Sequence, residues 1–91
     1  MKYAIVLTKQ YLRDVKLAKK RKLDINKLNK VVQLLAEDTP LPPRHKDHAL
    51  SGNYQGYREC HITPDWLLIY TKDTALHILS LVRNGSHSDL F

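Results

Sequence analysis

Apolar positions recur along this chain with a helical spacing in the first half and an alternating spacing in the second. The run at residues 3–7 is aromatic and β-branched, which predicts a strand that is apolar on both faces and therefore covered on both. Thr8 can cap the start of a helix that runs to about Lys22. Four apolar positions support that helix by their spacing: Tyr11, Leu12, Val15 and Ala18.

A second helical pattern follows after a brief turn near Leu23. Asp24 can cap its start, and apolar residues three and four apart form a stripe from Ile25 to Leu35. Because the connection is so short, the two helices should form an antiparallel hairpin. The apolar stripes are expected to pack on a sheet rather than to form a zipper with a partner.

Residues 38–50 lack periodicity and contain three prolines and two histidines, which predicts a stiffened surface loop that could form the wall of a site. Beyond Gly52 and Gly56, three strand-like runs follow at residues 57–62, 66–72 and 75–82. Short turns join them, so consecutive strands should pair antiparallel as a meander. The middle run is apolar on both faces, as a central strand would be.

The order of these elements is β-α-α-β-β-β, which predicts an α+β fold with a two-helix hairpin packed on a small antiparallel sheet. With 91 residues, we expect residues 1–91 to form a single domain with one modest core. Such a core leaves little room for a large buried cavity, so a function at a surface groove is favoured.

Charge points to a polyanionic partner, because Lys and Arg number 15 against 9 Asp and Glu, a formal net charge of +6. A solvated, inert basic surface is the alternative. Cys60 is the single cysteine, which excludes an internal disulfide and predicts a half-buried strand residue in a reducing compartment. No apolar run is long enough for a signal peptide or a membrane span, so we expect a cytoplasmic protein with no membrane contact. The outer face of the first helix is nearly all cationic: Lys9, Arg13, Lys16, Lys19, Lys20, Arg21 and Lys22.

Five histidines are present, and their positions in the predicted elements indicate different roles. His77 lies within the last predicted strand and should be structural or on the surface. His45 lies in the proline loop and should be solvated. The remaining three, His48, His61 and His87, are candidates for proton transfer near neutral pH.

The predicted meander brings the turn at Asp65 and the strand end at Arg83 to the same edge of the sheet, so His61, Asp65, Arg83 and His87 can share one rim. Imidazoles can transfer protons, and a guanidinium can stabilise a phosphate that gains charge. Trp66 and Phe91, if exposed, could stack bases. Together these features describe metal-independent RNA cleavage, in which the 2′-hydroxyl attacks the adjacent phosphorus. A zinc site is disfavoured because no tight ligand motif occurs, and an inert surface stands level with catalysis on residue chemistry alone.

Four ordered segments, Asp47 to Leu50, Gly56 to Ile62, Pro64 to Tyr70 and Arg83 to Phe91, resemble the YafQ toxins of the RelE superfamily of bacterial type II toxin–antitoxin systems. The resemblance implies a RelE-like fold and an endoribonuclease that cuts mRNA in the ribosomal A site without a metal or cofactor. It also implies inhibition by an acidic antitoxin, and contact with a DNA operator only through the antitoxin complex.

By this resemblance, His87 is the general acid for the departing 5′ oxygen and Arg83 stabilises the transition state. The base is either His48 or His61 positioned by Asp65, and Phe91 orients a base or the scissile phosphate. Trp66 lies beside these residues and is assigned to RNA contact. Where family members often have Arg-Thr-Gly-Thr-His, this chain has Arg-Asn-Gly-Ser-His at residues 83–87, which retains Arg, Gly and His. The cationic helix would grip ribosomal RNA through Lys16, Lys19, Lys20 and Lys22.

Two alternatives to a ribosome-dependent nuclease stay open from the sequence. The first is a non-catalytic module of the same fold that binds nucleic acid or an acidic partner through the same rim. The second is a ribonuclease that cuts free RNA.

Overall fold

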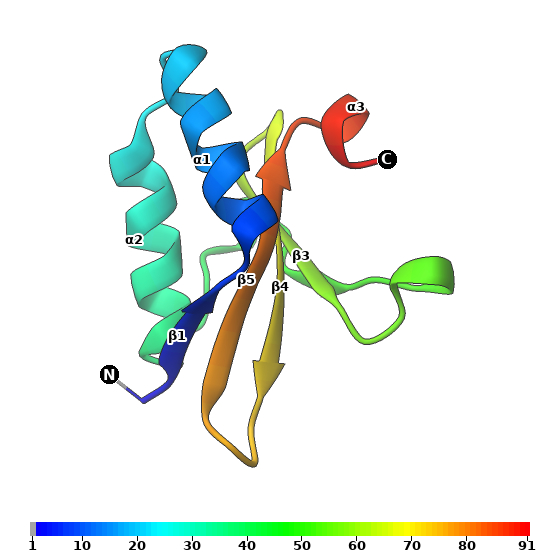
Figure 1. Cartoon of the computed structure of the whole chain (residues 1–91). Helices are drawn as coiled ribbons and strands as arrows, with labels where there is room; N and C mark the ends of the chain where they lie inside the picture. The colour runs from blue at the N-terminus through cyan, green and yellow to red at the C-terminus, as the bar shows by residue number, and fades with distance from the viewer. Residues whose placement is uncertain (1) are drawn as a thin grey trace.

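Two helices lie side by side on one face of a five-stranded sheet in the computed structural model, which describes residues 2–91 (Figure 1). This arrangement confirms the predicted α+β class. None of the helices within residues 2–91 combines the length and apolar character needed to cross a membrane. In chain order the elements are β1 (Ala4–Leu7), α1 (Lys9–Lys20), α2 (Ile25–Ala36), the 3₁₀ turn η1 (Pro43–His45), β2 (His48–Ala49), the 3₁₀ turn η2 (Gly52–Tyr54), β3 (Arg58–Thr63), β4 (Trp66–Asp73), β5 (Ile78–Gly85) and α3 (His87–Leu90).

The strands are arranged in the order β1-β5-β4-β3-β2, with β4 in the centre as its two apolar faces predict. β3, β4 and β5 form the predicted antiparallel meander. β1 instead pairs parallel to β5, with Ala4 opposite Ile78 and Leu7 opposite Leu81, so the sheet is mixed rather than antiparallel throughout. Parallel pairing needs a long crossover connection between the two strands, and the chain from α1 to β4 provides one.

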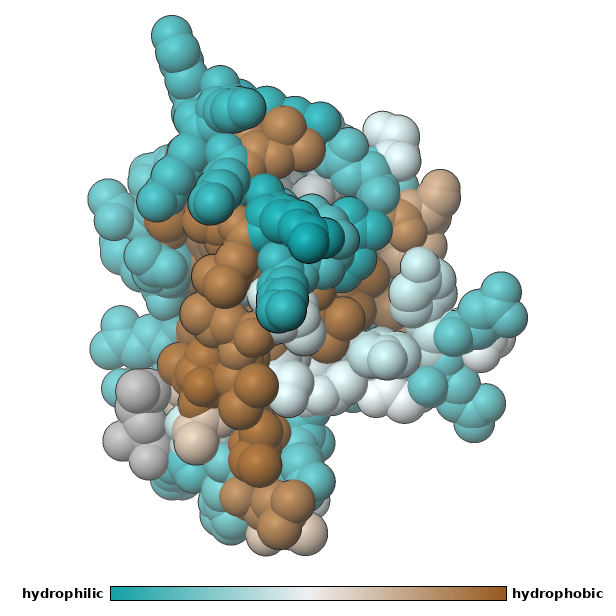
Figure 2. Space-filling model, in the orientation of Figure 1, coloured by the Kyte–Doolittle hydropathy of each residue, from teal (hydrophilic) through white to brown (hydrophobic). Residues whose placement is uncertain are grey.

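β1 forms an edge of the sheet, and this position corrects the expectation that both of its faces are covered. Tyr3, just before the strand, is buried, whereas Val6 and Leu7 remain 47% and 45% exposed. The apolar residues of this edge contribute to the hydrophobic surface in Figure 2. The apolar pattern at residues 3–7 therefore predicts the strand correctly but does not predict how far its side chains are buried.

Both predicted caps are confirmed. The Thr8 side chain accepts a hydrogen bond from the Tyr11 N–H at 3.0 Å, and the Asp24 side chain accepts one from the Asn26 N–H at 3.0 Å. α1 ends at Lys20, slightly earlier than predicted, and Lys22 adopts a φ of 60° in the turn that follows. The backbone of this turn reverses direction, so that α2 returns antiparallel to α1 as the sequence predicts.

The main core lies between the helices and the sheet. Leu28 and Leu35 of α2 pack with Cys60, Leu68 and Tyr70 of the sheet. Cys60 is fully buried rather than half-buried, and burial raises the pKa of its thiol to about 12. Hence the thiol is neutral and unreactive in the folded protein, in agreement with a structural role.

A second, smaller cluster lies on the sheet face that α1 and α2 leave uncovered. Leu67 and Ile69 of β4 pack there with Leu90 of α3, and Tyr54 of η2 packs against them. Strand alternation explains the division, because in β3 the residues Cys60 and Ile62 enter the main core while Glu59 and His61 point to the opposite face. The second face of the sheet therefore carries Glu59 and His61.

Two histidines differ from their sequence-based placement. His45 is buried, not solvated, and its Nδ1–H donates to the His61 carbonyl at 2.6 Å. His77 lies in the turn before β5 rather than inside the strand, with a φ of 55°. It is exposed, and its ring lies 5.4 Å from that of Tyr3, in agreement with the structural or surface role predicted for it.

Candidate active site

A buried carboxylate joins two of the candidate histidines. β2 pairs with β3 so that His48 stands directly opposite Glu59, and His61 lies two residues further along β3 on the same face. His48 Nε2 is 3.5 Å and His61 Nε2 is 3.9 Å from Glu59 Oε1. Glu59 is only 4% exposed, and within residues 2–91 its Oε2 has no hydrogen-bond partner. The Glu59 carboxylate thus lies between the two imidazoles.

The hydrogen bonds of the two rings fix which nitrogen is free to exchange a proton. His48 Nδ1 lies 2.6 Å from the Lys46 carbonyl oxygen, and His61 Nδ1 lies 3.3 Å from the Pro64 carbonyl oxygen. A carbonyl only accepts, so each Nδ1 carries the proton of that hydrogen bond. Nε2 of each ring is therefore the atom that takes or releases a proton, and it faces Glu59.

The segment that leads into β2 and His48 is anchored to the sheet by Asp47. The Tyr70 hydroxyl donates to Asp47 Oδ1 at 2.5 Å, and Arg58 Nη2 lies 3.3 Å from the same oxygen. Burial, with a smaller contribution from Asp47, raises the pKa of Tyr70, so its hydroxyl remains a donor at neutral pH. His48 is 49% exposed and so remains open to a ligand.

α3 brings the third histidine and the terminal aromatic to this face. The His87 ring centroid is 6.3 Å from that of His61 and 5.8 Å from that of Phe91. Phe91 in turn lies edge-on to Tyr54, at 5.3 Å between ring centroids, and the Tyr54 hydroxyl donates to the Leu90 carbonyl at 3.2 Å. Phe91 is 56% exposed. The three imidazoles and Phe91 therefore form one continuous row, which we call the histidine row.

The position of α3 depends on Asp89. Its carboxylate accepts from the Ser86 N–H at 2.9 Å while the Ser86 hydroxyl accepts from the Asp89 N–H, which forms a capping box. Arg21 at the end of α1 adds an ion pair to Asp89 at 2.6 Å. Hydrogen bonds from Arg21 and Ser86 hold the pKa of Asp89 well below its usual range. A Cβ on Gly85 would lie 3.0 Å from Asp89, which explains why glycine precedes the cap.

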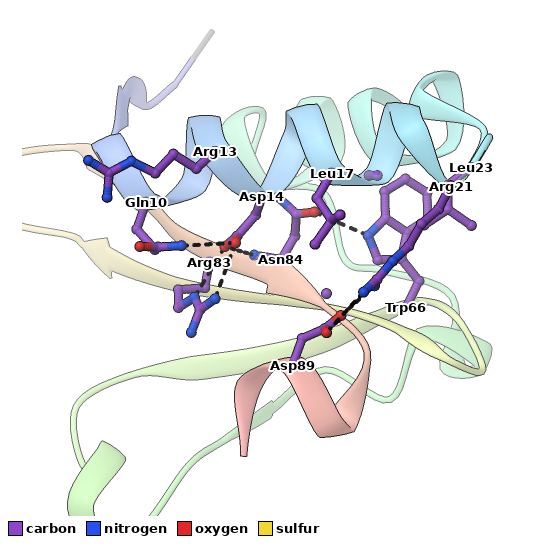
Figure 3. Close-up of a pocket in the computed structure, with 12 residues that line it drawn as sticks. Gln10, Arg13, Asp14, Leu17, Arg21, Leu23, Trp66, Arg83, Asn84 and Asp89 are labelled. Atoms are coloured by element: carbon purple, nitrogen blue, oxygen red, sulfur yellow. Dashed lines mark hydrogen bonds and ion pairs between the residues drawn. The ribbon is translucent and has the colours of Figure 1, made fainter.

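Arg83 belongs to a second group of side chains, under α1. Its Nε and Nη2 each donate to the Asp14 carboxylate at 3.1 Å, and the pKa of the Arg83 guanidinium is raised, chiefly by this hydrogen bond. Figure 3 shows Arg83 and Asn84 converging on Asp14 while Arg21 reaches Asp89. These residues line a cavity of about 250 Å³ between α1 and the start of α3.

Trp66 is 2% exposed and cannot stack bases, which corrects the sequence-based assignment to RNA contact. Its indole Nε1–H donates to Asn84 Oδ1 at 3.2 Å, beneath α1. Trp66 faces the same side as Leu68 and Tyr70, which are core residues, so the strand alternation that predicted a central strand also implies its burial. Trp66 therefore supports the framework of the site.

The predicted single cleft is only partly present. His48, His61 and His87 lie together with Phe91 at the edge of the row and His77 outside it. Asp65, in the β3–β4 turn, lines a separate cavity of about 140 Å³ with Arg21 and Ser86. The His61 ring nitrogens contact Glu59 and the Pro64 carbonyl, and within residues 2–91 no ion pair or hydrogen bond joins His61 to the Asp65 carboxylate. Across residues 2–91, no three His, Cys, Asp or Glu side chains are grouped so as to hold a metal ion.

The four lysines assigned to RNA are all exposed on α1 or the turn after it: Lys16, Lys19, Lys20 and Lys22.

Known proteins resemble this chain in sequence and in fold. Residues 3–91 match the family model of YafQ, described as a bacterial toxin of a type II toxin–antitoxin system. This chain belongs to the YafQ family. The mRNA interferase toxin YafQ of Escherichia coli strain K12 is 49% identical over 83 residues, which are 90% of this chain and 88% of that protein.

Solved structures of YafQ proteins share the fold of this family member. The crystal structure of YafQ from E. coli strain BL21(DE3) is 42% identical, covers 98% of both chains and superposes with a TM-score of 0.91. The E. coli DinJ–YafQ toxin–antitoxin complex contains a chain that is 43% identical, with a TM-score of 0.89 over 100% of this chain and 99% of that one. The fold predicted from the sequence is thereby confirmed as that of the YafQ family.

Two residues of this YafQ family member were not predicted as part of the site. Glu59 alternates with buried Cys60 and lies on the same face as His61, so a carboxylate at that position of a central hairpin was the available signal. Asp14 is the only acidic residue of α1, placed next to the apolar stripe formed by Tyr11, Val15 and Ala18. A lone acid beside the buried stripe of a cationic helix indicates a buried ion pair, but the sequence does not name its partner.

Proposed function

We propose that this YafQ family member is an mRNA interferase, an endoribonuclease that cuts mRNA by metal-independent acid–base catalysis with the ribose 2′-hydroxyl as nucleophile. The observation that carries the proposal is the histidine row, in which the His61 and His87 rings lie 6.3 Å apart with Phe91 beside them. Two imidazoles at that separation can flank one phosphodiester, so that one accepts a proton while the other donates one. The E. coli relative that is 49% identical is named an mRNA interferase.

His87 is the proposed general acid, because it is exposed at the start of α3 and a proton on its ring can reach a departing 5′ oxygen. Phe91, 5.8 Å away and exposed, would stack on a base next to the scissile phosphate. This stacking would orient the substrate relative to the acid.

His61 is the proposed general base in preference to His48, because its ring is the one adjacent to His87. The Pro64 carbonyl holds the proton on His61 Nδ1, which leaves Nε2 to receive the proton of the 2′-hydroxyl. Glu59 would stabilise the imidazolium that forms. His48 contacts the same carboxylate from β2 and would share that role.

Arg83 is the proposed electrostatic stabiliser of the pentavalent phosphorane, since its side chain is 31% exposed and its guanidinium has N–H groups beyond those bound to Asp14. Asp65 lies beside the start of α3, where its proposed contribution is to shape the approach of the RNA.

Ribosome dependence follows in this proposal from the open form of the histidine row. His48 and Phe91 are about half exposed, so the protein alone offers few walls to hold RNA in an in-line geometry. The ribosome would supply that positioning. The exposed lysines of α1, among them Lys16, Lys19 and Lys20, would bind ribosomal RNA phosphates, and this binding should weaken with salt.

The proposed partner that silences the toxin is a cognate acidic antitoxin, since this chain carries a formal net charge of +6. An E. coli YafQ has been solved in complex with the antitoxin DinJ. Contact with a DNA operator would occur only through the antitoxin complex.

The test is His87→Ala, with His77→Ala as the matched control because His77 is an exposed histidine outside the row. The proposal expects induced wild-type protein and H77A to arrest growth and cleave mRNA on translating ribosomes, and H87A to do neither. Cleavage of naked transcript by the purified protein would overturn ribosome dependence. RNA binding without cleavage by the wild type would favour a non-catalytic binding module of the same fold.

A further inference from the structure

Asp14 has all the acceptor positions of its carboxylate occupied, although it lies on a helix that is otherwise cationic. It is 7% exposed and is the only acid of α1. Four N–H donors from three residues converge on it: Gln10 Nε2 to Oδ1 at 3.1 Å, Arg83 Nη2 to Oδ1 at 3.1 Å, Arg83 Nε to Oδ2 at 3.1 Å, and the Asn84 backbone N–H to Oδ2 at 3.2 Å. A carboxylate has about four lone-pair positions, so none is left for solvent or substrate.

The contact with Arg83 is bidentate and uses one defined edge of the guanidinium. Arginine has five N–H donors, of which Asp14 takes the one on Nε and one on Nη2. The two on Nη1 and the second on Nη2 are not bound by Asp14 and form the free edge of the guanidinium. A planar, two-point contact fixes both the position and the plane of the group, which a single ion-pair contact would not.

A chain of hydrogen bonds also fixes Asp14 to the sheet. The Asn84 backbone N–H binds Asp14, and the Asn84 side chain accepts from the Trp66 indole at 3.2 Å (Figure 3). Asn84 is 2% exposed and Trp66 is equally buried. Asn84, the neighbour of Arg83 in β5, thereby links α1 to the start of β4.

We propose that Asp14 is a positioning residue for RNA cleavage, which holds the Arg83 guanidinium with its free edge toward the scissile phosphate. This inference rests on the proposed function, since it concerns the same reaction. Asp14 itself would not contact RNA, because its acceptor positions are occupied and its charge would repel phosphate. Without Asp14 the guanidinium would be released into several rotamers, and the loss would appear in the rate of the chemical step rather than in RNA binding.

The test is a double-mutant cycle with Asp14→Asn and Arg83→Ala, read as the single-turnover rate of mRNA cleavage on ribosomes. Asn keeps the shape of Asp14 but places an N–H₂ group against the donors of Arg83. In the wild-type background D14N should lower the rate by about 10-fold to 100-fold, with ribosome binding changed by less than about 2-fold. In the R83A background D14N should cause no further loss of rate.

Equal losses from D14N in both backgrounds would overturn the inference, because a merely structural role does not depend on Arg83. A D14N rate equal to that of the wild type would overturn it as well. Glu37→Gln is the matched control, since it makes the same acid-to-amide change at an exposed residue after α2 and should leave the rate unchanged.

If D14N fails to fold, as judged by circular dichroism, the cycle is repeated with Asp14→Glu. Glu keeps the charge but is longer by one methylene, so it should shift the guanidinium and lower the rate only when Arg83 is present. A D14E loss that persists in the R83A background would overturn the inference. If the wild type itself cuts no mRNA, the proposed function fails, whereas a wild type that cuts beside an unaffected D14N removes only the role of Asp14.

Discussion

Arg21 Nη1 lies 2.6 Å from Asp89 Oδ2, and this ion pair links the end of α1 to α3 across 68 positions of sequence. α3 has only four residues, too few to form a stable helix alone. It is held by the capping box at Ser86, the burial of Leu90 and this pair. Because α3 begins at His87 and is followed directly by Phe91, the ion pair connects the basic helix to the histidine row.

The first prediction concerns this link. Arg21→Ala should lower mRNA cleavage several-fold, because α3 would lose its contact with α1 while the main core stays intact. Global stability should change little, since Arg21 is an exposed residue. Hydrogen exchange should report faster opening of the amides at residues 87–91. Lys27→Ala, which removes an exposed cation from α2, is the control; equal effects of the two changes would show that only net charge matters.

A second prediction follows from the pKa of Asp89, which its hydrogen bonds with Arg21 and Ser86 lower. A depressed folded-state pKa gives stabilisation that is fully present above the unfolded value of about 3.9 and is lost as the pH falls through the folded value. The stability difference between wild type and Asp89→Asn, measured by urea unfolding, should therefore be constant from about pH 8 to pH 5 and shrink below about pH 4. A difference that changes between neutral pH and pH 6 would contradict this assignment.

Local sequence features predicted much of the fold. The caps at Thr8 and Asp24 act over two or three residues, and the β3–β4–β5 meander depends on short turns. The parallel pairing of β1 with β5 joins residues more than seventy positions apart, as Ala4 opposite Ile78 illustrates. Nothing within residues 3–7 encodes that partner, so neither the mixed sheet nor the exposed edge could be predicted from them.

The candidate site shows the same limit. His61 and His87 were predicted as neighbours because both lie near strand ends at one edge, and their rings are indeed 6.3 Å apart. The roles of Asp14 and Glu59 depend on tertiary contacts, with α1 over β5 and β2 opposite β3. Residue type alone does not specify such contacts, so the roles of both carboxylates could be assigned only from the structure.

The third prediction tests the structural role of Trp66. Trp66→Phe removes the indole donor and leaves Asn84 Oδ1 buried without its partner, which should destabilise the fold by about 1–3 kcal/mol. Trp66 is the single tryptophan of the chain, so its fluorescence reports this site alone. Emission should be little quenched by acrylamide and unchanged when RNA binds. Quenching of the folded protein by RNA would instead indicate an exposed, stacking indole.

By contrast, Phe91→Ala should lower cleavage with little effect on stability, because Phe91 is 56% exposed. Its ring lies beside those of His87 and Tyr54 at the end of the histidine row. Comparing thermal unfolding and cleavage for W66F and F91A separates a framework aromatic from a substrate-contacting one. Loss of stability in F91A as large as that in W66F would refute the distinction.

The last prediction concerns Glu59, whose Oε1 lies 3.5 Å from His48 Nε2 and 3.9 Å from His61 Nε2. Glu59→Gln keeps the size of the side chain but removes the charge that would stabilise an imidazolium in the reaction. We expect cleavage to fall by about 10-fold to 100-fold with the fold retained, less than the roughly 100-fold to 10,000-fold that a general acid or base itself contributes, because the imidazoles remain in place. The exposed change Glu37→Gln should leave cleavage unaltered.

Combining Glu59→Gln with each histidine variant then identifies the base. If His61 is the base, His61→Ala should reduce cleavage far more than His48→Ala, and adding E59Q to H61A should cause little further loss, because the charge has no imidazolium left to stabilise there. If H48A is the more damaging change and masks E59Q instead, the proton passes to His48. Cleavage by E59Q at the wild-type rate would show that the buried carboxylate serves only the packing of β2 against β3.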